Sequence, residues 1–116
     1  MITNYNIAIN YKSRIDASAW IYREMMSEYK LMHYSGNSDG AVPTSGTRAW
    51  IAKMGLRATR AERNYVTAGN SSYTGQITEF GNFTFATING TGHMAPQWKR
   101  EEVTTLITNF IHGEPI

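Results

Sequence analysis

Residues 83–97 read FTFATINGTGHMAPQ, and this stretch decides the fold. In its first part, residues 83, 85 and 87 alternate with residues 84, 86 and 88, a pattern typical of a β-strand. The strand is expected to stop at the turn-forming run 89–92, and His93 follows directly. We therefore predict a strand over 83–88 that presents a histidine on the loop after its end.

A second stretch, residues 31–40, reads LMHYSGNSDG and has the same organisation. A short apolar strand over 31–34 is predicted to end at a dense turn signal, which presents Asp39. Glycine, asparagine, serine and aspartate favour turns for different conformational and hydrogen-bonding reasons. This stretch therefore predicts a second loop with an ionisable side chain after a strand.

Three helices are predicted around these loops, over about residues 17–28, 44–54 and 103–112. Asp16 would cap the first, and Thr44 or Ser45 the second, while Gly55 and Gly113 would end the last two. The apolar faces would be formed by Trp20, Ile21 and Met25; by Trp50, Ile51 and Met54; and by Val103, Leu106, Ile107, Phe110 and Ile111. With two further strands at 65–66 and 71–80, helices and strands alternate, which is typical of an α/β fold.

Both loops follow a strand and precede a helix, where functional groups collect in α/β sheets. An acid followed by a histidine is the chain order of the α/β-hydrolase triad, in which the serine comes first. Serine needs an imidazole to take its proton, and a carboxylate orients that imidazole. The spacing alone leaves the alternative that Asp39 is only a turn former and His93 only a solvated side chain.

Residues 34–43, YSGNSDGAVP, together with residues 47–51, TRAWI, resemble the serine carboxypeptidase segment with the catalytic aspartate. Residues 83–97 resemble that family's catalytic-histidine segment, and weaker likeness covers residues 16–29 and 110–115. The resemblance implies an α/β-hydrolase fold. Residues 1–116 would be its C-terminal portion, part of a sheet with flanking helices that is incomplete on its own.

The resemblance implies that Asp39 is the triad acid and His93 the triad base. Met94 would border the pocket for the released C-terminal residue, although a core or rim methionine is an equal alternative. The pattern Gly-x-Ser-x-Gly occurs only at residues 36–40, inside the segment that resembles the family's catalytic-aspartate loop. The resemblance therefore implies that the nucleophilic serine lies outside the chain, and the chain alone is expected to be inactive. The family usually has aspartate where this chain has Asn37, and valine where it has Ala95.

The expected reaction is serine-type hydrolysis of C-terminal residues from peptides, without a cofactor. The expected partners are the peptide substrate and the missing N-terminal portion of the hydrolase domain. The resemblance places the parent enzyme in a lysosome or vacuole, or outside the cell. Two alternatives stay open: a carboxypeptidase-like acyltransferase, and a truncated, non-catalytic interaction subunit that docks through a bare sheet edge.

Composition excludes several other classes of protein and of functional site. Hydrophobic residues make up 41% and charged residues 17%, which is typical of a globular protein. The absence of cysteine excludes thiolate zinc sites and a cysteine nucleophile. No apolar run approaches the ~20 residues that span a bilayer, and residues 1–10 do not resemble a secretory signal.

Isolated charged and polar residues have simpler interpretations. Lys53, Arg57, Arg60 and Arg63 could contact phosphate, but no recognition motif accompanies them, so we expect no nucleic-acid binding. His33 lacks a second ligand at metal-site spacing and is interpreted as a strand histidine with a local hydrogen bond. Glycosylation sequons begin at residues 70, 82 and 89 and would matter only in a secreted protein.

Overall fold

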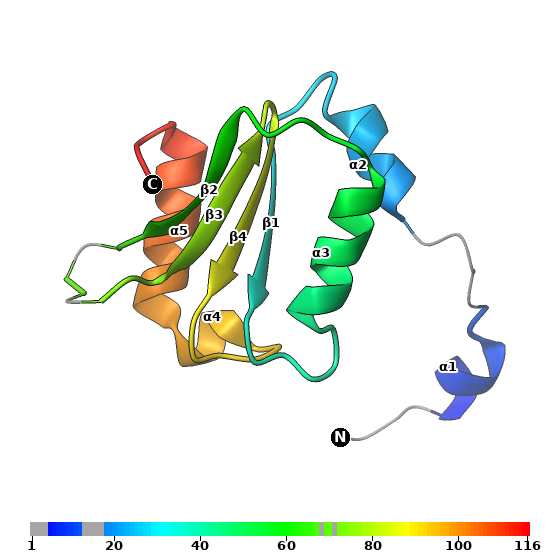
Figure 1. Ribbon diagram of the computed structural model, residues 1–116. Helices are drawn as coiled ribbons and strands as arrows, with labels where there is room; N and C mark the ends of the chain where they lie inside the picture. Colours follow the sequence, from blue (N-terminus) through cyan, green and yellow to red (C-terminus); the bar gives the residue numbers. More distant parts are fainter. Residues whose placement is uncertain (1–4, 13–17, 68, 71) are drawn as a thin grey trace.

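The computed structural model describes residues 5–12, 18–67, 69, 70 and 72–116. A sheet lies between two layers of helices, with α4 and α5 on one side and α2 and α3 on the other, while α1 lies apart (Figure 1). The elements in chain order are α1 (Tyr5–Asn10), α2 (Ala19–Met25), β1 (Leu31–Gly36), α3 (Thr44–Lys53), β2 (Arg60–Tyr65), β3 (Gly75–Phe80), β4 (Phe83–Ile88), α4 (Ala95–Trp98) and α5 (Arg100–His112).

The sheet is mixed, and its order β1-β4-β3-β2 places β1 at one edge. β1 runs parallel to β4, with Leu31 opposite Phe83 and Gly36 opposite Ile88. β3 runs antiparallel to both β4 and β2. Because β1 and β4 are parallel and in register, the two loops that follow them emerge at the same end of the sheet. Among the described residues, this four-stranded sheet with flanking helices is compatible with part of an α/β fold.

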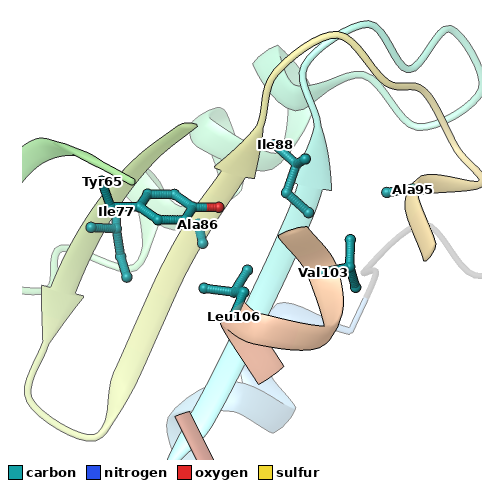
Figure 2. Packing of buried hydrophobic residues seen from close by; sticks show 7 residues of the cluster. All are labelled: Tyr65, Ile77, Ala86, Ile88, Ala95, Val103 and Leu106. Carbon is teal, nitrogen blue, oxygen red and sulfur yellow. The ribbon is translucent and has the colours of Figure 1, made fainter. Parts of the chain in front are cut away.

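One half of the core lies between the sheet and α5 (Figure 2). Ala86 and Ile88 of β4 and Ile77 of β3 pack against Val103 and Leu106 of α5, and all five are buried. Burial of each large aliphatic side chain contributes about 1.5–3 kcal/mol relative to exposure. This packing fixes β4 and the start of the loop that follows it against a rigid helix.

The other half of the core lies between the sheet and α3. Phe83 and Phe85 of β4 pack against Ile51 and Met54, all of them buried. β4 is therefore buried on both faces, as expected for a strand between two helical layers. The predicted strand over 83–88 is confirmed with its bounds.

The first helix differs from its prediction. It begins at Ala19, and the predicted Asp16 cap lies outside the described residues. Tyr22 and Met26 pack on the sheet, whereas Trp20, 60% exposed, faces solvent with Ile21 and Met25. The predicted apolar face is wrong because the ring of Tyr22 joins an aromatic cluster on the sheet, which turns the other three side chains outward.

The second helix confirms its predicted face but not its cap. Ile51 and Met54 are buried and Trp50 is half-buried. The N-cap position is Pro43, with no side-chain cap, so neither Thr44 nor Ser45 caps the helix. The Thr44 hydroxyl instead donates to the Gly36 carbonyl at 3.0 Å, which ties the start of α3 to the end of β1.

The last helix, α5, is confirmed, and Gly113 ends it in the left-handed region with φ of +71°. Ile111 is exposed rather than buried, because it lies at the margin of the apolar stripe.

Helices α1 and α4 were not predicted, and β2 begins five residues before the predicted 65–66. β3 begins at Gly75 rather than at Ser71, which lies outside the described residues together with the middle of the sequon at Asn70.

Candidate active site

The two loops predicted to hold functional groups lie beside each other at the carboxyl ends of β1 and β4. Backbone hydrogen bonds continue past the strand ends: Asn37 N–H donates to Ile88 O at 2.9 Å, and Ser38 N–H donates to Thr91 O at 2.9 Å. These bonds join the first residues of the two loops through the backbone.

Gly36 is where the backbones come closest. A Cβ atom at this position would lie 2.4 Å from Gly92 O and 2.5 Å from Thr91 O, far inside van der Waals contact. Both obstructing atoms belong to the backbone, so they cannot move aside as a flexible side chain could. Only glycine allows β1 to pass this close to the loop that holds His93.

Asp39 and His93, the two residues predicted to form an acid–base pair, meet across the loops. His93 Nδ1 lies 2.9 Å from Asp39 Oδ2. The Asp39 side chain is 7% exposed and that of His93 is 59% exposed, so the imidazole extends from a largely buried carboxylate toward solvent. With Nδ1–H donating to the carboxylate, Nε2 is left as the acceptor that a general base needs.

Asp39 is held in place by the start of the next segment. Its other oxygen, Oδ1, accepts hydrogen bonds from the backbone N–H groups of Ala41 at 2.8 Å and Val42 at 2.9 Å. The Val42 bond, followed by His93 and Ala41, lowers the pKa of Asp39 below its ordinary value, although burial opposes the shift. Asp39 therefore stays ionised in mildly acidic solution.

Met94 is the third residue predicted for the site. It follows His93 at the N-cap position of α4 and is 53% exposed. Its exposure excludes the core alternative and places it at the rim of the loop. A contact between Met94 and a substrate residue stays a prediction.

His33 lies within β1 among aromatic rings, whereas Asp39 and His93 lie on the loops after the strands. Its Nδ1 is 3.0 Å from the Tyr22 hydroxyl, which fits the predicted strand histidine with a hydrogen bond. Its ring is also close to Trp50, with ring centroids 5.4 Å apart. Burial lowers the pKa of His33 below its ordinary value. Among the described residues, no group of three or more potential ligands could hold a metal ion.

The lowered pKa of His33 predicts a pH-dependent stability. Below pH 6.5 His33 binds a proton in the unfolded chain but not yet in the folded chain. The free energy of unfolding therefore decreases as the pH falls from 6.5 toward the folded pKa, and it is recovered when the pH is raised above 6.5 again. Urea unfolding of the complete protein should show that a His33→Gln variant loses less stability than the wild type between pH 7.5 and pH 5. An equal loss in both proteins would contradict this assignment.

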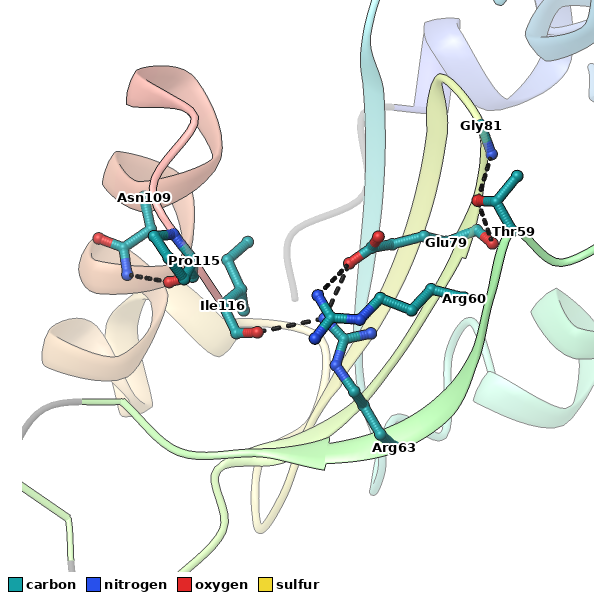
Figure 3. Close-up of polar contacts among 8 residues, drawn as sticks. All are labelled: Thr59, Arg60, Arg63, Glu79, Gly81, Asn109, Pro115 and Ile116. Carbon is teal, nitrogen blue, oxygen red and sulfur yellow. Dashed lines mark hydrogen bonds and ion pairs between the residues drawn. The ribbon is translucent and has the colours of Figure 1, made fainter.

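The basic residues considered as a phosphate-contacting patch are partly neutralised. Arg63 donates to Glu79 at 2.8 Å and to the carbonyl of Ile116 at 3.2 Å, and Arg60 lies 3.6 Å from the same carboxylate (Figure 3). Glu79 is near the end of β3, which runs antiparallel to β4, so these contacts lie at the opposite end of the sheet from His93.

Sequence reasoning missed two residues of the site. Both residues lie in the predicted turn signal, and Asn37 departs from the family pattern, but the sequence predicted no contact for either. The signal for both was present, since they lie within three residues of Asp39. Their partners could not be predicted because Ile88, Thr91 and Gly92 are more than 50 residues away in the chain and meet these positions only through the β1–β4 pairing.

The amino-acid sequence is similar to those of known proteins. The family model described as serine carboxypeptidase matches residues 2–113. Serine carboxypeptidase-like 33 of Arabidopsis thaliana is 30% identical over 99% of this chain and 24% of its own length. Serine carboxypeptidase 1 of Hordeum vulgare is 32% identical over 76% of this chain and 17% of its own length. The chain therefore spans about a quarter or less of these relatives.

Proposed function

Because this chain belongs to the serine carboxypeptidase family, we propose that it supplies the acid and the base of a Ser-Asp-His triad that releases C-terminal residues from peptides. Asp39 is the acid and His93 the base, and the nucleophilic serine lies outside residues 1–116. The observation that supports this most strongly is the 2.9 Å contact between His93 Nδ1 and Asp39 Oδ2 at the ends of two parallel strands.

The proposed reaction uses the free nitrogen of His93. Nε2 takes the proton of the serine hydroxyl as its oxygen attacks the carbonyl carbon of the last peptide bond. The imidazolium, stabilised by Asp39, gives that proton to the leaving amino group, and an acyl-enzyme remains. Water then attacks the acyl carbonyl, His93 takes the proton of the water, and the serine regains a proton as the shortened peptide leaves.

We further propose that the parent enzyme works in a lysosome or vacuole, or outside the cell. Membership of the serine carboxypeptidase family supports this proposal. No helix of the described ranges has the length and apolar character needed to cross a bilayer.

The sheet suggests how the remaining part of the enzyme would attach. β1 is an edge strand, and the exposed Ile21 and Met25 of α2 line a hollow together with Leu31 and Met32 of β1. The edge of a sheet presents unpaired backbone N–H and C=O groups, and exposed apolar side chains beside it favour association with another surface. We propose that the missing N-terminal portion of an α/β-hydrolase domain pairs with β1 and covers these side chains.

This proposal predicts the behaviour of the isolated chain. Residues 1–116 expressed alone should aggregate or bind a hydrophobic dye strongly, because the edge of β1 and the apolar face of α2 are uncovered. Co-folding with the serine-bearing portion should suppress dye binding and produce carboxypeptidase activity. An isolated chain that is a monodisperse monomer with cooperative unfolding would contradict the incomplete-sheet proposal.

A non-catalytic interaction subunit is the second candidate, favoured by the position of β1 at the edge of the sheet. It predicts binding to the same partner without hydrolysis. An acyltransferase would use the same acid and base but pass the acyl group to an acceptor other than water. Products formed with and without an added alcohol acceptor distinguish it from a peptidase.

A further inference from the structure

The side chain of Asn37 uses both ends of its amide to connect the two loops of the candidate site. Its Oδ1 accepts a hydrogen bond from the backbone N–H of Gly90 at 3.0 Å, and its Nδ2 donates to Asn89 Oδ1 at 2.8 Å. Because a backbone N–H can only donate, the Asn37 atom that faces Gly90 must be the oxygen. The orientation of the Asn37 amide, and with it that of Asn89, follows from this one contact.

These contacts lie close to both members of the proposed acid–base pair. Asn37 is two residues before Asp39, and Gly90 is three residues before His93. Two backbone bonds also join these segments: Asn37 N–H donates to Ile88 O at the strand end, and Ser38 N–H donates to Thr91 O in the loop. The side chain of Asn37 adds a polar bridge to the turn at 89–90, which lies between the positions of these two backbone bonds.

We propose that Asn37 is a positioning residue that sets the distance between Asp39 and His93. Its side chain makes no hydrogen bond to Asp39 or His93, so it acts through the loop separation and not as a catalytic residue. Its effect on turnover rests on the proposed function, whereas its effect on the His93–Asp39 hydrogen bond rests on the geometry alone. A displacement of about 1 Å at such a pair can cost on the order of 10²-fold in rate.

Three variants of the complete enzyme separate this role from general stability. Asn37→Leu keeps a similar volume but removes the hydrogen bonds to Asn89 and Gly90, and also one from the Ser38 hydroxyl, and leaves the Gly90 N–H without this acceptor. Asn37→Asp keeps the acceptor for Gly90, and Asn89 can rotate its amide to donate to the new carboxylate. Asn109→Leu is the matched control, because it removes a side-chain bond to Pro115 O at the other end of the sheet.

The first measurement is the strongly downfield proton signal of His93 Nδ1–H bound to Asp39 in the NMR spectrum, assigned by its loss in His93→Gln. We expect this signal in the wild type, Asn37→Asp and Asn109→Leu, and its loss or broadening in Asn37→Leu. The second measurement is peptide hydrolysis, where Asn37→Leu should lower kcat about 10- to 100-fold with KM little changed. Asn37→Asp should stay within about threefold of the wild type.

An Asn37→Leu enzyme that keeps both the proton signal and kcat would overturn the proposal, as would equal losses in Asn37→Leu and Asn109→Leu. If Asn37→Leu does not fold, Asn89→Ala replaces it, with a weaker signal and lower kcat expected and no change contradicting the role. If the signal follows the expected pattern but no variant hydrolyses peptides, the proposed function fails and the positioning role stands.

Discussion

Replacing His93 with alanine in the complete enzyme is expected to lower kcat for peptide hydrolysis by about 10³-fold or more. Without the imidazole no group in the site can take the proton of the serine hydroxyl, and Asp39 loses the ring that it orients at 2.9 Å. KM should change little, because the substrate contacts proposed for the pocket remain. Steady-state kinetics on a peptide substrate measures both quantities.

His112 provides the control for this variant. It lies in the last turn of α5, is exposed, and belongs to a different part of the fold. His112→Ala removes at most a favourable contact with the helix dipole, so kcat should stay within about twofold of the wild type. A His93→Ala enzyme that turns over at the wild-type rate would remove the histidine from the mechanism.

Gly36→Ala is expected to destabilise the complete enzyme by about 3 kcal/mol or more, because the added methyl group would overlap backbone that is fixed from both sides. The new Cβ would lie 2.4 Å from Gly92 O and 2.5 Å from Thr91 O. Any relief must push the end of β1 away from the loop of His93, so activity should be lost with stability. Urea unfolding and peptide hydrolysis measured on the same preparation test both expectations.

Gly46→Ala is the matched control for this substitution. Gly46 lies in α3, and a Cβ there would meet no atom within 4 Å. Alanine in a helix is favoured over glycine by roughly 0.5–1 kcal/mol, so this variant should be as stable as the wild type or slightly more stable. A Gly36→Ala enzyme with wild-type stability would contradict the close approach of the two backbones.

The elements with the strongest local patterns were predictable. The strand over 83–88 was confirmed although both of its faces are buried, because its β-branched and aromatic residues end at a clear turn signal. The last helix was confirmed because its period-3.6 pattern indicates the covered face, where Val103 and Leu106 are buried. The approach of Asp39 to His93 also agrees with the loop placement read from sequence, since parallel neighbouring strands bring their following loops to one edge.

Features that depend on tertiary contacts were not predictable. The apolar face of the first helix was wrong because the fit of Tyr22 to the rings of Trp50 and Phe83 outweighs local hydrophobicity. The capping of α3 was wrong because the hydroxyl of Thr44 is used by Gly36 and Ser35, which come from β1. Local patterns hold no information about which distant group will compete for a side chain.

The contacts of Asn37 are a further feature of the site that the local sequence pattern did not predict. A departure from a family pattern identifies a position at which chemistry differs, but it does not say what the new side chain contacts. Only the pairing of β1 with β4 places the amide of Asn37 against Gly90 and Asn89, 53 and 52 positions along the chain. The sequence therefore identified the acid and base candidates, and the fold identified what holds them together.

Labelling of the complete enzyme with a fluorophosphonate tests the central claim most directly, because the reagent reacts with a serine only when a base takes its proton. The wild type should be modified at one serine outside residues 1–116, and His93→Ala should react about 10³-fold more slowly or not at all. No labelling of the wild type, or equal labelling of both proteins, would show that Asp39 and His93 do not serve a nucleophilic serine.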